Sequence, residues 1–231
     1  MAGPVTIRWI TQPDLSVAQA AYIVATGAPC IDSKTEALLI EAATAINTRL
    51  ISASLDVREF WRTYRSQVTL HIDGVKACSV ALLAAGCSAV QLEQTAKAIA
   101  SRMIDGRMEF HRRVPKLVEQ LELRGRPLKE RWDTVGAGLL LDVQRQVWGD
   151  SPPLRWWPAK TEGLLVQPMR GGDGGCEPSG GRFWIEAMLT DADPQVPEVL
   201  RVAWLITCLA IDNHLPDASP ALIQAWSLAA V

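Results

Sequence analysis

Residues 164–189, LLVQPMRGGDGGCEPSGGRFWIEAML, decide the fold class. Both ends of the stretch, 164–169 and 182–189, are rich in aliphatic and aromatic residues and predict strands. The 12 residues between them, 170–181, include six glycines, and glycine is typical of turns because it tolerates backbone conformations that other residues avoid. We therefore expect a small antiparallel β-hairpin in the C-terminal part of the chain.

Helical patterns surround this hairpin. Residues 199–211 form a run in which only Arg201 and Thr207 are clearly polar, so we expect a helix at the centre of a core. Helix signals occur in seven further segments, 14–27, 33–50, 56–65, 76–85, 88–103, 127–148 and 221–230. Two more short strands are predicted at 5–10 and 67–72. The predicted fold class is therefore α+β, mostly helical, with a small antiparallel β-hairpin or sheet in the C-terminal part.

Helix-breaking residues suggest how the chain is divided. Gly125 and Pro127 predict the end of one helix and the start of the next, and residues 149–163 mark a change in composition, with three prolines and two tryptophans. We expect a helical region at 1–125 and a helix–hairpin–helix α+β region at 126–231. A single domain over the whole chain stays open as an alternative.

Composition excludes several classes of protein. The 231 residues carry a net charge of −2, with 48% hydrophobic and 21% charged residues, as in an ordinary globular protein. The longest nearly apolar run has 13 residues, whereas a membrane-spanning helix needs about 20, and the N-terminus lacks the pattern of a signal peptide. Basic residues gather at 102–131, but the near-neutral balance of the chain argues against nucleic-acid binding. We expect a cytoplasmic protein with no membrane and no nucleic acid among its partners.

Cysteine and histidine spacing offers no metal motif. The five cysteines include no C-x-x-C pair, and none of the three histidines lies within four residues of another, whereas zinc sites usually show such spacings. An odd number of dispersed cysteines is typical of reduced thiols in a reducing compartment. We expect no cofactor, no metal and no structural disulfide.

Four polar residues are the candidates for catalysis. Cys176 with His214 and Asp212 offers the residue types of a thiol nucleophile, its base and the group that orients the base. Glu186 offers a carboxylate for acid–base chemistry, and we expect it to be solvated or paired with an arginine on the strand face opposite Ile185. The alternatives without catalysis are an incidental loop thiol and a polar helix end at Asp212 and His214.

The glycine-rich loop is the candidate binding segment. Its residues Gly171, Gly172, Asp173, Gly174 and Gly175 match a phosphate-binding loop in composition alone, because neither G-K-[ST] nor G-x-G-x-x-G is present. Long loops often carry function, so we expect a partner surface here. A flexible hairpin loop without a role is the alternative.

Five segments in residues 124–213 carry a resemblance. They are GAGLL at 136–140, VQP at 166–168, GGDG at 171–174, IEAML at 185–189 and PEVLRVAWL at 197–205. On these residues the region resembles an uncharacterised bacterial protein family of unknown function, which implies a helix–hairpin–helix unit and no particular activity. The order of elements is also similar to the core of zinc metallopeptidases, but residues 200–204, LRVAW, offer no metal ligand where the metal-binding helix would lie. That likeness implies an inactive relative.

These features together favour a non-catalytic intracellular interaction or scaffold protein whose partner is another protein. The alternatives are an unrecognised hydrolase, based on a thiol or a carboxylate, and an inactive zinc-metallopeptidase-like relative. A homo-oligomer is compatible with each of them. We lean towards a protein that is not an enzyme.

Overall fold

The computed structural model describes residues 5–72, 74–149 and 151–230, and the chain forms two compact units. The helical unit spans Gln12–Val118. The sheet unit combines the N-terminal segment up to Thr11 with the chain from Glu119 onward. Mostly helical α+β architecture with a small sheet, as the sequence predicts, is confirmed.

The helical unit consists of helices that bury small and aromatic side chains against one another. Its members are α1 (Pro13–Thr26), α2 (Ser33–Ser52), α3 (Val57–Thr69), α4 (Gly74–Ala84) and α5 (Ala89–Arg113). Gly27 ends α1 in the left-handed conformation, as its position predicts. The N-cap of α2 is Asp32, whose side chain accepts the backbone N–H of Thr35. These two helix ends are thus set by local capping chemistry.

The strand predicted at 67–72 is wrong, because these residues end α3 and form the following turn. Val68 is buried on the same helix face as Phe60, Trp61 and Tyr64, and this spacing is helical. The Phe60 and Tyr64 rings are stacked with centroids 6.1 Å apart, and the Trp61 ring meets Phe60 edge-on at 5.5 Å. Burial of this aromatic cluster outweighs the β-branched composition of the last turn.

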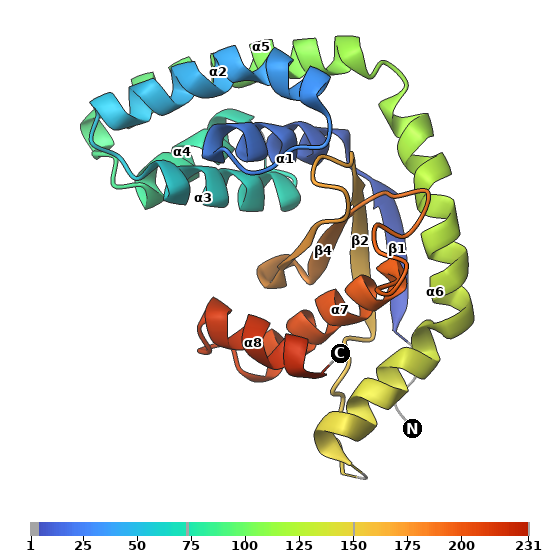
Figure 1. The fold of residues 1–231 in the computed structure, drawn as a ribbon. Helices are drawn as coiled ribbons and strands as arrows, with labels where there is room; N and C mark the ends of the chain where they lie inside the picture. The colour runs from blue at the N-terminus through green and yellow to red at the C-terminus, as the bar shows by residue number, and fades with distance from the viewer. Residues whose placement is uncertain (1–4, 73, 150, 231) are drawn as a thin grey trace. The chain divides into compact units, whose positions relative to one another are not determined.

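The sheet has four strands in the order β1-β2-β4-β3. They are β1 (Thr6–Thr11), β2 (Lys160–Val166), β3 (Gly174–Glu177) and β4 (Arg182–Glu186). β1, β2 and β4 run parallel, as neighbouring arrows in Figure 1, and β3 pairs antiparallel with β4. Gly163 in β2 leaves space above the sheet in which Trp9 of β1 and Phe183 of β4 meet edge-on at 5.7 Å.

The antiparallel hairpin is formed by β3 and β4, and not by the two segments that were predicted as its arms. The segments predicted as its two arms, 164–169 and 182–189, contribute β2 and β4, and these strands are parallel neighbours. The antiparallel partner of β4 is β3, which lies within the supposed glycine loop. Gly175 is required there because a Cβ atom would come within 2.7 Å of the Trp184 indole nitrogen. Glycine therefore serves close packing of a strand at this point, not turn formation.

Three helices complete the sheet unit: α6 (Leu117–Trp148), α7 (Glu198–His214) and α8 (Pro220–Ala230), with a short 3-10 turn, η1, at Pro178–Gly180. α7 packs against β3, β4 and α8, as Figure 1 shows for β4 and α8. Its residues Val202, Leu205 and Ile206 are fully buried, which agrees with the expected central helix. Within the described ranges, no helix is long and apolar enough to cross a membrane.

The helix break predicted at Gly125 and Pro127 is wrong, because α6 continues through both residues. Gly125 is present for packing: a Cβ atom would lie 2.3 Å from Cδ1 of Leu165 in β2. The boundary that we expected between 125 and 126 therefore falls inside a continuous helix. The two compact units divide between Val118 and Glu119, near the start of the same helix, and between Thr11 and Gln12.

Candidate functional site

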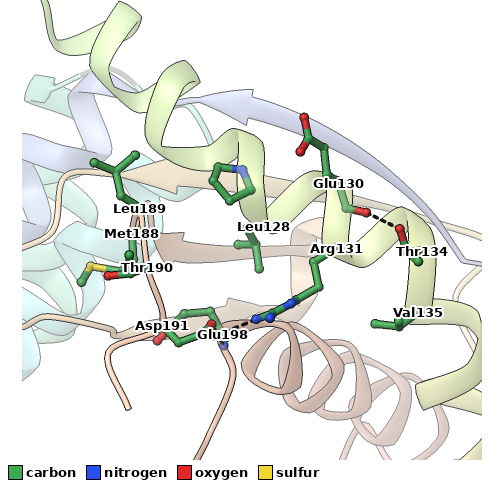
Figure 2. Close-up of a pocket in the computed structure, with 11 residues that line it drawn as sticks. Leu128, Glu130, Arg131, Thr134, Val135, Met188, Leu189, Thr190, Asp191 and Glu198 are labelled. Carbon is green, nitrogen blue, oxygen red and sulfur yellow. Dashed lines mark hydrogen bonds and ion pairs between the residues drawn. The ribbon is translucent and has the colours of Figure 1, made fainter. Parts of the chain in front are cut away.

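A pocket of about 620 Å³ opens where β4 ends, and we call it the edge pocket. Its walls come from α6, from the segment that follows β4 and from the first residue of α7, as Figure 2 shows. The lining residues are Pro127, Leu128, Glu130, Arg131, Thr134, Val135, Met188, Leu189, Thr190, Asp191 and Glu198. The carboxyl ends of parallel strands are the usual place for ligand sites in sheets of this kind.

An ion pair crosses the edge pocket. Arg131 Nη1 lies 2.6 Å from Oδ2 of Asp191, which Figure 2 shows as a dashed line. The other carboxylate oxygen, Oδ1, accepts the backbone N–H of Glu198 at 2.8 Å. That N–H hydrogen bond, together with the Arg131 guanidinium, lowers the pKa of Asp191. The side chain of Asp191 thus connects α6 to the first turn of α7.

Glu198 contributes a partly satisfied carboxylate. Its side chain is buried, and Oε2 pairs with Nε of Arg201 at 3.0 Å. Oε1 has no hydrogen-bond partner among the residues that the structure describes, and it lies 2.9 Å from the point where a Cβ atom on Gly172 would be. A buried carboxylate oxygen that lacks a hydrogen-bond donor is costly.

Glu186 is neither solvated nor paired with an arginine, so that expectation is wrong. The residue is fully buried, and its Oε1 accepts the backbone N–H groups of Met169 and Arg170, each at 2.8 Å. Oε2 accepts the N–H of Gly172 at 2.8 Å. The carboxylate thus satisfies three backbone donors of the segment that follows β2. Both oxygens are already engaged by the backbone.

The glycine loop is ordered by its own contacts. Gly171 and Gly172 have φ values of 82° and 113°, which residues with a side chain rarely adopt. Asp173 accepts the N–H of Gly174 at 2.9 Å. Gly174 and Gly175 belong to β3. None of these five residues lines the edge pocket, although Gly172 lies next to Glu198, which does.

The three residues of the candidate thiol site do not assemble. Cys176 donates a hydrogen bond to the carbonyl of Leu205 at 3.2 Å, whereas the His214 ring stacks on Trp156 with centroids 5.1 Å apart. In the described part of the chain, no recorded contact joins Cys176 to His214. Burial, with Asp212 as one of several neighbouring groups, raises the pKa of the Cys176 thiol, and a protonated thiol is a poor nucleophile.

His214 belongs to different surroundings. With Trp148, Trp156 and Trp226 it lines an apolar pocket of about 380 Å³, and its Nε2 lies 3.3 Å from the carbonyl oxygen of Arg155. Burial and the nearby Glu177 carboxylate raise the pKa of Asp212. Over the described residues, no cluster of three or more histidine, cysteine or acidic side chains is suited to a metal ion.

Comparisons with protein-family models, curated proteins and solved structures find no match to this chain. The resemblance of residues 124–213 to an uncharacterised family therefore stays an expectation.

The edge pocket was missed in the sequence because its key contacts are not local. Asp191 precedes Glu198 by more than the spacing of a helix cap, and Arg131 lies on a helix with many charged residues. One signal was available. Pro197, which precedes α7, has no side-chain acceptor for the first N–H groups of that helix, so a more distant acceptor is required.

Proposed function

We propose that this chain is a non-catalytic protein-interaction module whose edge pocket binds a peptide segment with an apolar side chain next to a basic one. The observation that carries the proposal is the make-up of the pocket wall. Leu128, Val135 and Leu189 supply apolar surface. Three acidic residues and one arginine line the pocket among the described residues, namely Glu130, Asp191, Glu198 and Arg131. Asp191 pairs with Arg131 and Glu198 pairs with Arg201, so Glu130 supplies the charge that a basic partner group would meet.

Two physical effects favour such a ligand. Leu189 and Val135 are 55% and 39% exposed, so a partner side chain that covers them removes apolar surface from water. A lysine or arginine beside that side chain would meet the acidic rim at Glu130, which improves orientation and the rate of association. The volume of about 620 Å³ lies within the usual range of ligand pockets.

Two carboxylates, Asp191 and Glu186, have partners at both of their oxygens, which supports a role without catalysis for these two groups. Asp191 is held by Arg131 and by a backbone N–H, and Glu186 is held by three backbone N–H groups. A general acid or base needs a free position that faces the substrate. A cytoplasmic location is part of the same proposal, because all five cysteines are free thiols, as is usual in a reducing compartment.

A random-peptide display library selected on the full-length protein tests the proposal. We expect enrichment of peptides in which an aliphatic or aromatic residue adjoins a lysine or arginine. Leu189→Arg should weaken the binding of an enriched peptide by about tenfold or more, equivalent to about 1.4 kcal/mol. Leu141→Arg is the matched control, because Leu141 is 43% exposed on α6 and does not line the edge pocket.

Either of two outcomes would contradict the proposal. One is enrichment of acidic peptides or of no common pattern. The other is equal loss of binding in the Leu189 and Leu141 variants, because the bound surface would then lie elsewhere. Raising the salt concentration should weaken the binding of basic peptides, since the charges at the rim are exposed to solvent.

A further inference from the structure

A pair of thiols lies where β3 packs against α7. The Cys176 side chain on β3 reaches the carbonyl oxygen of Leu205 on α7, with Sγ and O 3.2 Å apart. Cys208 lies three residues after Leu205, within one helical turn of that carbonyl group. The two thiols are near enough for each to shift the pKa of the other. We call Cys176 and Cys208 the thiol pair.

The surroundings make the two thiols unequal. The neighbouring Cys176 thiol and the hydrogen bond between Cys208 and the Ser227 hydroxyl, with Sγ and Oγ 3.1 Å apart, lower the pKa of Cys208 in spite of its burial. Burial, the Cys208 thiol and the carboxylates of Asp212 and Glu177 raise the pKa of Cys176. When one proton leaves the pair, the negative charge therefore resides on Cys208 and the remaining proton on Cys176.

The pair also differs from the other cysteines of the chain. Cys78 and Cys87 are buried in the helical unit, and Cys30 lies in the same unit. Cys176 is partly exposed, whereas Cys208 is 5% exposed. A small oxidant that approaches along Cys176 thus meets two neighbouring sulfur atoms, and the thiolate form is the one that reacts.

We propose that Cys176 and Cys208 are a site of reversible oxidation, at which a peroxide forms a disulfide between β3 and α7. The Cys208 thiolate attacks one peroxide oxygen, so that an S–O bond forms, the O–O bond breaks and the released hydroxide takes up a proton to become water. Sγ of Cys176 then attacks Sγ of the Cys208 sulfenic acid. An S–S bond forms, the S–O bond breaks, and the proton of Cys176 leaves with the oxygen as a second water. The two sulfurs lose two electrons and the peroxide gains them.

Peptide mapping of the full-length protein tests the proposal. The native protein is treated with hydrogen peroxide, unfolded, alkylated at its remaining thiols and digested. We expect one disulfide-linked peptide that contains Cys176 and Cys208, an intact mass lower by two hydrogen atoms before alkylation, and alkylation of Cys30, Cys78 and Cys87. Dithiothreitol added after the peroxide should restore all five free thiols.

Two variants sharpen the result. Cys176→Ser should abolish the linked peptide and leave oxygen adducts on Cys208, because the sulfenic acid then has no thiol to resolve it. Cys30→Ser is the matched control and should keep the linked peptide. A disulfide between any other cysteines, or oxygen adducts without a Cys176–Cys208 link in the unaltered protein, would overturn the proposal. The unaltered protein alone decides this, so the outcome does not depend on the folding of a variant.

Discussion

Glu186 is a fully buried carboxylate whose two oxygens accept three backbone N–H groups. Glu186→Gln replaces one oxygen by an amide nitrogen, which would face a backbone donor instead of accepting from it. We expect a loss of about 2–4 kcal/mol in the free energy of unfolding, because the buried donor loses its acceptor. Urea denaturation measures the change.

The matched control for Glu186→Gln is Glu122→Gln, since Glu122 is exposed on α6. We expect the control to stay within about 0.5 kcal/mol of the unaltered protein. Equal stability of the two variants would show that the loop after β2 does not depend on the buried carboxylate.

Two glycines of α6 are expected to respond oppositely to the same substitution. Alanine normally stabilises a helix by about 1 kcal/mol relative to glycine. Gly138→Ala should follow this rule, because nothing lies within 4 Å of the added methyl group. Gly125→Ala should instead destabilise the protein by about 1–3 kcal/mol, because its methyl group would lie 2.3 Å from Leu165 Cδ1. Thermal denaturation compares the two, and stabilisation by both would place α6 farther from β2.

At the scale of elements, the start of α7 depends on Asp191. Asp191→Asn removes the negative charge from the ion pair with Arg131 and from the N-terminal end of the helix. We expect a loss of about 1 kcal/mol near neutral pH. Chemical denaturation checks this, and the exposed Asp142→Asn on α6 is the control.

The contribution of Asp191 should depend on pH with a definite sign. The pKa of Asp191 is lowered from 3.8 by the Glu198 N–H and by Arg131. A carboxyl group with a lowered pKa in the folded state stabilises the protein at pH values above its unfolded pKa, and the stabilisation is lost as the pH falls through the folded pKa. The stability difference between the unaltered protein and Asp191→Asn should therefore shrink as denaturation is repeated below about pH 4. A constant difference down to pH 2 would contradict this assignment.

The same element scale shows what the sequence can and cannot predict. The end of α1 at Gly27 follows from capping, and the buried helix at 199–211 follows from its apolar residues. Both are local properties of the sequence. Pairing between strands is not local, so nothing in residues 164–189 indicated that β3 would lie within the glycine-rich stretch and on the far side of β4. The ion pair between Arg131 and Asp191 joins residues that are 60 positions apart, and a single sequence contains no signal for that contact.

At the scale of the molecule, removal of the first 11 residues should affect one unit and leave the other folded. β1 pairs with β2 over its whole length, Thr6 to Thr11, so a chain that begins at Gln12 exposes a parallel strand edge. We expect such a chain to lose stability in the sheet unit and to aggregate. The fragment 12–118 is the control: it contains all of the helical unit and should show cooperative unfolding by circular dichroism. A monomeric truncated chain with unchanged stability would contradict the role of β1.

The pairing of β1 with β2 has a consequence for synthesis on the ribosome. Thr6 of β1 pairs with Lys160 of β2. About 150 residues, including the whole helical unit, must therefore be translated before β1 can pair with β2. At about 5–20 residues per second, the first strand waits roughly 8–30 s. During that time the helices, whose contacts are local, are able to fold, whereas the apolar strand at the N-terminus is exposed to other nascent chains. We therefore expect the newly made protein to depend on chaperones that hold extended segments, and to recover more completely from dilute refolding than from rapid expression.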